Sequence, residues 1–201
     1  MGPSYRAARI AKWASLPAAL LVSGLLVSQA SYSAFSATTN NPGNNWASGT
    51  LALTNDAGTA LFNATNIKPG DAGTKCITVS TTATVASTLK LYAATYSKGT
   101  KSLGDRINVT VTSGSFAGAA PANGACTGFT AGSVAVPTAS LTAFAAASTN
   151  YATGADSFAL PAGGSRTYKI DWTFASAGST AADNPYQGDT ASIGFTWEAQ
   201  S

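Results

Sequence analysis

Residues 166–174 read Arg-Thr-Tyr-Lys-Ile-Asp-Trp-Thr-Phe, with a large apolar side chain at every second position from Tyr168 to Phe174. Side chains alternate between the two faces of a β-strand, so this pattern predicts a half-buried strand. The predicted inward face carries Tyr168, Ile170, Trp172 and Phe174, and the outward face carries Thr167, Lys169, Asp171 and Thr173. Residues 190–198 repeat the pattern with Ile193, Phe195 and Trp197. These aromatic side chains are predicted to anchor one core.

Other short alternating stretches precede these two, separated by Gly, Pro and Asn turns. We expect strands at 50–54, 75–80, 88–96 and 107–112, a loop at 114–132, and one short helix near 140–147. No βαβ spacing is present. The pattern therefore predicts an all-β fold, a two-sheet β-sandwich of jelly-roll type.

The N-terminus resembles a secretory signal. Three basic residues are followed by a broken apolar run from Ala14 to Val27, which is too short for a comfortable transmembrane helix. Cleavage fits after Ala30, or after Ser33 with Ser31 at position −3. We expect a signal peptide over 1–33 and export from the cell. The alternative is a retained N-terminal anchor.

Signal removal changes the charge of the protein. Three of the eleven Lys and Arg residues leave, so eight basic and eight acidic residues remain. No basic stripe is left for electrostatic binding of nucleic acid. A net charge of zero favours self-association, because little repulsion keeps copies apart.

Two cysteines, Cys76 and Cys126, are predicted to form a disulfide in an exported protein. The closed loop of about 50 residues would contribute about 4 kcal/mol in the chain-entropy picture. Two free buried thiols are the alternative.

The mature chain divides into an N-terminal strand and linker, 34–45, and a sandwich domain, 46–201. The first segment begins with Ala34, Phe35, Ser36, Ala37, Thr38 and Thr39, and continues into an Asn-Asn-Pro-Gly-Asn-Asn linker. Such a free segment can pair with the sheet edge of a neighbouring subunit, which predicts assembly by strand donation.

Three segments together resemble the TasA/camelysin-like proteins of Gram-positive bacteria. They are Ala34-Phe35 with 45–53 (Asn-Trp-Ala-Ser-Gly-Thr-Leu-Ala-Leu), 66–71 (Asn-Ile-Lys-Pro-Gly-Asp), and 184–189 (Asn-Pro-Tyr-Gln-Gly-Asp) leading into 195–200. The resemblance implies secretion through a dedicated signal peptidase, cleavage between Ser33 and Ala34, and a place in biofilm-matrix fibres. The region 97–165 and the cysteine pair depart from the family pattern.

No catalytic constellation is found in the sequence. The chain has no His, so a His-ligated zinc site and a Ser-His or Cys-His pair cannot form. Most of its acids fall in predicted turns. Asp183, Asn184 and Asp189 match no calcium-loop spacing. We expect no enzymatic activity, no cofactor and no metal. A camelysin-like secreted metalloprotease remains the weaker alternative, which the resemblance alone suggests.

The aromatic residues suggest a binding module as the second function class. Trp172 and Trp197 fall on inward positions, whereas Tyr92 and Tyr96 are predicted to share the outward face of one strand. They could stack on cell-wall polysaccharide. The sequence thus predicts a secreted structural protein whose partners are its own copies, with contact to the membrane only before signal removal.

Overall fold

A computed structural model describes residues 36–40, 46–47, 52–57 and 61–201. The predicted signal peptide, the cleavage residues Ser31, Ser33 and Ala34, and Phe35 lie outside the described residues. Residues 35–201 form a compact unit of their own. Within the described part of the chain, no helix has the length and apolarity needed to cross a bilayer.

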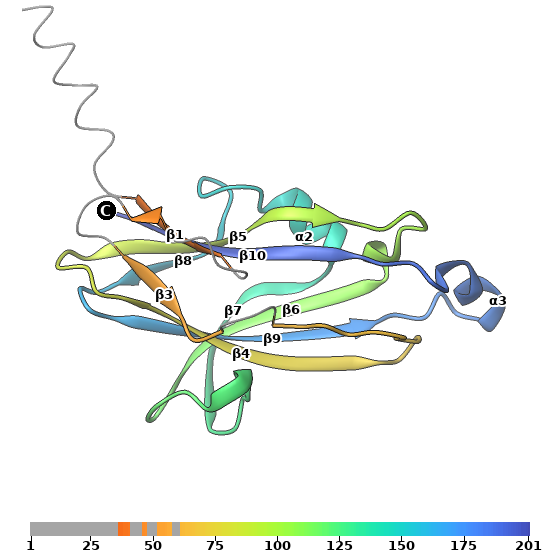
Figure 1. Cartoon of the computed structure of the whole chain (residues 1–201), viewed down its shortest axis with the longest axis horizontal. Helices are drawn as coiled ribbons and strands as arrows, with labels where there is room; N and C mark the ends of the chain where they lie inside the picture. The colour runs from red at the N-terminus through yellow and green to blue at the C-terminus, as the bar shows by residue number, and fades with distance from the viewer. Residues whose placement is uncertain (1–35, 41–45, 48–51, 58–60) are drawn as a thin grey trace, which may run out of the picture. The chain divides into compact units, whose positions relative to one another are not determined.

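Ten strands form two five-stranded antiparallel sheets that face each other (Figure 1). Sheet A has the order β2-β1-β10-β5-β8, with bounds Trp46–Ala47, Ser36–Asn40, Ser192–Gln200, Ser87–Ser97 and Ala155–Leu160. Sheet B has the order β3-β4-β9-β6-β7, with bounds Leu53–Asn55, Ala72–Thr81, Ser165–Phe174, Ile107–Phe116 and Phe129–Ser140. The predicted all-β sandwich is therefore confirmed at the level of two packed antiparallel sheets.

Helical elements are short and lie in the connections. The predicted helix at 140–147 is confirmed as α2, Leu141–Ala147, which begins where the Ser140 hydroxyl accepts a hydrogen bond from the Ala143 N–H. Its Leu141 and Phe144 side chains are buried against the core. The others are α3 (Thr180–Asp183) and the 3₁₀ turns η2 (Leu103–Asp105), η3 (Ala122–Gly124) and η4 (Asn184–Tyr186).

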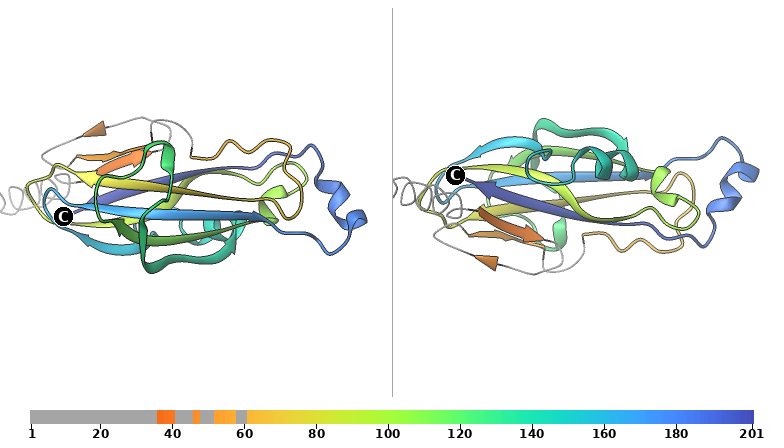
Figure 2. Two further views of the ribbon diagram at one scale, coloured as in Figure 1. Left: turned by 90° about the horizontal axis from the view of Figure 1, so that it is seen from below. Right: turned by 90° about the horizontal axis from the view of Figure 1, so that it is seen from above.

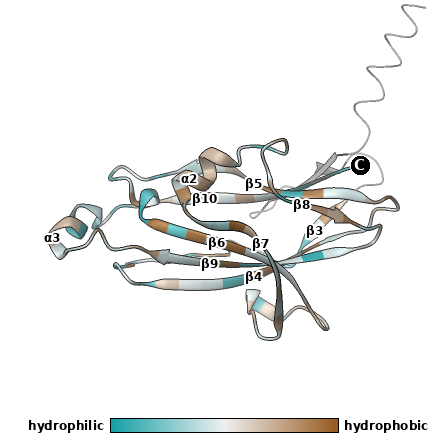
Figure 3. Cartoon of the chain, turned by 180° about the vertical axis from the view of Figure 1, so that it is seen from behind, coloured by the Kyte–Doolittle hydropathy of each residue, from teal (hydrophilic) through white to brown (hydrophobic). Residues whose placement is uncertain are grey.

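The core lies between the sheets and follows the alternation of the strands. Apolar positions along these strands are visible in Figure 3. Trp197 of β10 and Tyr168 of β9 are fully buried, and their rings, from opposite sheets, lie 5.5 Å apart. The predicted inward residues Ile170, Phe174 and Phe195 are also buried.

Two predicted inward residues, Trp172 and Ile193, are only partly buried. Both belong to the half of the sandwich that lies nearer α3, where the sheets diverge around a cavity that Trp172 lines. Strict alternation reports which face a side chain occupies, but not whether the opposite sheet closes over it.

The middle of the chain is more ordered than its composition suggested. The predicted loop 114–132 is instead the end of β6, a connection, and the start of β7, and β8 was not predicted at all. Small Ala, Gly, Ser and Thr residues make up most of β7, and its side chains are mostly exposed. Such an edge strand carries no apolar alternation for sequence reasoning to detect.

Cys76 of β4 and Cys126 of the β6–β7 connection form the predicted disulfide, with Cα atoms 5.2 Å apart. Cys76 lies next to the inward Ile77, so the bond lies on the outer face of sheet B. The Lys75 ammonium donates to the Asn123 carbonyl at 2.7 Å beside it. The disulfide thus fastens the β6–β7 connection over the outside of the sheet.

Candidate functional site

Strand β1 lies along β10 of its own chain (Figure 2). The antiparallel register pairs Ser36 with Gln200 and Asn40 with Thr196. The sequence predicted Ala34 to Thr39 as a tail outside the sandwich that pairs with a neighbouring subunit. In the single chain, the described part of this segment, Ser36, Ala37, Thr38 and Thr39, pairs with β10 in the chain's own sheet A. Pairing with a neighbouring subunit stays a prediction.

Strand β1 is placed beside β10 by backbone pairing. Its sequence, Ser-Ala-Thr-Thr-Asn, offers no large apolar side chain to anchor it. On its other side it pairs with the two-residue strand β2, through the pairs Ala37–Ala47 and Thr38–Trp46. The same strand of another copy can make the same main-chain pairing with β10.

We call residues Thr196–Gln200 of β10 the β1 seat. Three of its residues are buried: Trp197 and Ala199 are 0% exposed and Thr196 is 1% exposed. Glu198 points outward, where its carboxylate accepts hydrogen bonds from the Tyr92 hydroxyl at 2.8 Å and the Gln200 amide at 2.7 Å. The β1 seat is therefore a rigid, regular stretch of sheet that presents an unpaired backbone edge whenever β1 departs.

Three other edge strands in the described chain, β3, β7 and β8, are poor acceptors for a strand. Edge strand β3 has three residues. Edge strand β7 shows three register irregularities against β6 and contains Pro137. Edge strand β8 has an irregular register against β5 and holds Asp156 at a φ of 54°. Short length, bulges and proline are the features that block edge-to-edge pairing, so these three strands are poorer acceptors than the β1 seat.

Tyr92 and Tyr96 do not share a face, contrary to the prediction. A register shift opposite Gly194 and Phe195 interrupts the alternation of β5 between the two tyrosines. Tyr92 stays on the outer face beside Glu198, and burial together with that carboxylate raises its pKa. Tyr96 packs against the core, with its hydroxyl 2.5 Å from the Thr142 hydroxyl. The two rings therefore do not form a paired platform on which a sugar could stack.

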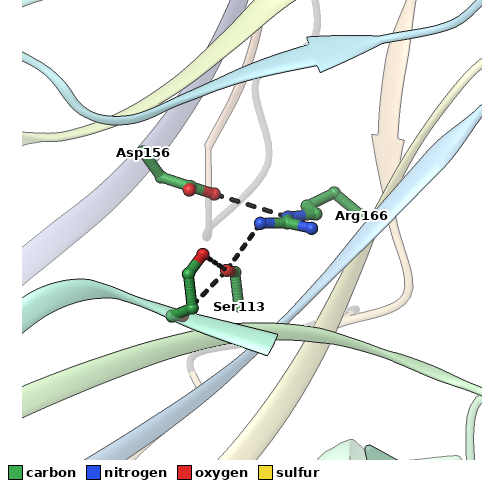
Figure 4. Close-up of polar contacts among 4 residues, drawn as sticks. Ser113, Asp156 and Arg166 are labelled. Carbon is green, nitrogen blue, oxygen red and sulfur yellow. Dashed lines mark hydrogen bonds and ion pairs between the residues drawn. The ribbon is translucent and has the colours of Figure 1, made fainter. Parts of the chain in front are cut away.

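A polar cluster joins the two sheets beside the edges formed by β7 and β8 (Figure 4). The Arg166 guanidinium of β9 lies 3.5 Å from the Asp156 carboxylate of β8 and donates to the Ser113 hydroxyl of β6 at 2.6 Å. It also stacks on the Phe158 ring, 4.0 Å from the ring centroid. Sequence reasoning missed this cluster. The available signal was a charged residue, Arg166, at an inward position of its strand.

Replacing Arg166 with Met is expected to lower the free energy of unfolding by about 2–3 kcal/mol. The Asp156 side chain is only 10% exposed and would lose its counter-charge. Urea unfolding followed by tryptophan fluorescence measures the loss. The double variant Arg166→Met with Asp156→Asn removes both charges, keeps a residue that tolerates the φ of 54° at position 156, and should recover most of it. No recovery would contradict the assignment of Arg166 as the partner of Asp156.

The Tyr168 hydroxyl lies near this cluster. It is buried and has no hydrogen-bond partner among the described residues. Burial, reinforced by the Asp156 carboxylate, raises its pKa well above the ordinary value. An unfolded chain ionises its tyrosines near pH 10, whereas the folded chain keeps Tyr168 neutral. Its contribution to stability is thus present below pH 10 and lost above it.

Unfolding experiments between pH 8 and pH 12 therefore should show stability falling above about pH 10, with Tyr168 contributing about 1.4 kcal/mol per pH unit. Tyr168→Phe should reduce that slope and leave stability at pH 7 unchanged or slightly higher, because it removes an unpaired buried hydroxyl. The fold also raises the pKa of Tyr92, by burial and by its hydrogen bond to Glu198, so Tyr92→Phe should reduce the slope as well. An unchanged alkaline slope in Tyr168→Phe would contradict this reading.

The acidic residues of the α3 end serve the local structure. Asp189 accepts hydrogen bonds from the backbone N–H groups of Thr100, Lys101 and Leu103. Burial raises the pKa of Asp189, but these donors outweigh it and the pKa is lowered. Asp183 binds the Ser176 hydroxyl and the Ala177 N–H. Within the described ranges, no group of three or more acidic, Cys or His side chains is placed to hold a metal ion.

Comparison with known protein families found no matching family model. Comparison with curated proteins found no matching sequence.

Proposed function

We propose that this chain is a secreted structural protein that assembles into extracellular fibres by exchanging β1 between subunits. The observation that carries the proposal is the pairing of β1 with the β1 seat through backbone contacts. A neighbouring chain can supply the same segment with the same register. The resemblance of three sequence segments to TasA/camelysin-like proteins gives this assembly its suggested setting, a biofilm or cell-surface matrix.

The strand orders support a jelly roll as the finer description of the sandwich. Without the short β2 and β3, the sheets read β1-β10-β5-β8 and β4-β9-β6-β7. In this arrangement the chain crosses repeatedly from one sheet to the other, as in a double Greek key. The first strand of a jelly roll lies beside the last. When β1 leaves, the backbone edge of β10, the C-terminal strand, is therefore exposed in sheet A.

Signal removal would act as the switch for exchange. While residues 1–33 remain attached, the leading end of β1 is held at the membrane during export. Cleavage between Ser33 and Ala34 would free that end, and a net charge of zero would lower the repulsion between arriving copies. Each donated strand leaves the donor's own β1 seat open, so pairing is head-to-tail and propagates into a fibre.

Deletion of residues 34–39 from the mature protein tests the proposal. We expect no ordered filaments by negative-stain electron microscopy under conditions where the intact mature chain forms them. The matched control replaces residues 41–45 with a Gly-Ser linker of equal length, which keeps the strand and should still assemble. Filaments from the deletion variant would overturn the proposal, as would an intact mature chain that stays monomeric at high concentration.

The competing class is a monomeric cell-wall or polysaccharide-binding module. Tyr92 and Tyr96 lie on different faces, and both hydroxyls are already hydrogen-bonded, so the geometry gives this class less support. Pull-down on purified cell walls together with size-exclusion chromatography separates the two. A casein-degradation assay with and without chelator addresses the weaker metalloprotease alternative.

A further inference from the structure

A cavity of about 540 Å³ opens between the sheets in the half of the sandwich nearer α3. The β1 seat, at the opposite end of β10, does not line it. Its floor is formed by Val109 of β6 and by Ile170 and Trp172 of β9, and Phe195 of β10 faces them from sheet A. The volume lies within the usual range of small-molecule sites.

One wall of this cavity is held by side-chain packing and not by hydrogen bonds among the described residues. Residues 61–67 form one side of it and have no regular secondary structure. Among the described residues, this segment makes no hydrogen bond, and the first fixed point after it is the Lys68 N–H on the Asp71 carboxylate at 2.9 Å. Leu61, Phe62 and Ile67 pack against the core, and the Phe62 ring lies edge-on to Trp172, with ring centroids 6.5 Å apart. A segment of this kind opens more readily than the strands beside it.

The chemistry of the lining selects against a charged ligand. Asp189 is the only ionisable carboxylate in the described lining, and its oxygens already accept the hydrogen bonds of the 100–103 turn. Among the residues that the structure describes, no Lys or Arg lines the cavity. The polar side chains of the 61–67 wall, Asn63, Thr65 and Asn66, are exposed to solvent. The interior therefore suits the apolar part of a ligand. The polar side chains of the 61–67 wall can contact an uncharged polar group at the other end of that ligand.

We infer that this cavity binds a neutral, largely apolar small molecule, which enters by displacement of the 61–67 wall. Side chains such as Val109, Ile170 and Phe195 make the inner lining apolar, which favours an apolar occupant over water. An engineered apolar cavity of about 150 Å³ binds benzene, so this one accommodates a molecule roughly three times larger. The site does not depend on the proposed assembly, since it lies away from the β1 seat.

Titration of the mature chain with N-phenyl-1-naphthylamine, a neutral fluorescent probe, tests the inference. We expect a saturable rise in probe fluorescence at one molecule per chain. Ala191→Phe places a ring in the cavity and should weaken probe binding at least tenfold. Ala159→Phe makes the same change at an exposed position of β8 outside the cavity and should leave binding unchanged. Absent or unsaturable binding, or equal binding by Ala191→Phe, would overturn the inference.

Hydrogen exchange on the unsubstituted protein keeps the test decisive if Ala191→Phe does not fold. The backbone amides of 61–67 should exchange rapidly without the probe and at least tenfold more slowly at saturation, because the occupied cavity holds the wall in place. Probe binding without protection of 61–67 would place the site elsewhere. Neither measurement requires filaments, so its failure is distinct from failure of the assembly proposal.

Discussion

A disulfide between positions 38 and 198 is expected to hold the protein as a monomer and to abolish filaments. Thr38 and Glu198 are direct cross-strand partners in the β1–β10 ladder. Such partners have Cα atoms about 4.5–5.5 Å apart, within the range that a disulfide spans. In the oxidised Thr38→Cys, Glu198→Cys variant, β1 cannot leave its own seat. Size-exclusion chromatography and electron microscopy of the mature chain measure the outcome.

The matched control is Thr38→Ser with Glu198→Ser, which also removes the hydrogen bond between Tyr92 and Glu198 but forms no crosslink. It should assemble as the unsubstituted chain does. Mixing the two single-cysteine variants adds a positive test, because a crosslink between different chains forms where β1 of one chain lies on the β1 seat of another. Filaments from the locked variant would show that assembly uses some other surface.

The sequence does not determine which sheet β1 joins, its own or that of a neighbouring chain. Alternation, small polar residues and a following Asn-Pro-Gly linker predict an extended segment near residue 36. The hydrogen bonds that such a segment makes are the same in its own sheet and in a neighbour's. The sequence therefore predicts the strand and leaves its partner undetermined.

Elsewhere, the sequence predicts burial correctly where the side chains are large and alternate with polar residues. Tyr168, Phe195 and Trp197 are large and alternate with polar residues, so their burial was predictable. The Tyr92–Tyr96 pair was not, because a bulge changes the phase of a strand without any residue that marks it. Asp156 and Arg166 are ten residues apart on opposite sheets, and only the folded chain brings them together.

Replacing Trp197 with Ala is expected to lower the free energy of unfolding by about 3–5 kcal/mol. The side chain is 0% exposed, and its ring lies 5.5 Å from Tyr168 and 6.4 Å from Phe195. These rings come from both sheets, so the cavity left by truncation would weaken their packing and the β1 seat together. Urea unfolding of the mature chain, followed by far-ultraviolet circular dichroism, measures the loss.

Trp172→Ala is the matched control, because it makes the same truncation at a ring that the sequence pattern also places inward. Trp172 is only partly buried and already borders the cavity, so fewer contacts are lost and about 1–2 kcal/mol is expected. Trp197→Phe should cost less than Trp197→Ala, since it keeps an aromatic ring and removes an indole N–H that has no hydrogen-bond partner among the described residues. Equal losses for Trp172→Ala and Trp197→Ala would mean that the sheets close equally tightly over both rings, which would contradict the cavity as well as the packing of the core.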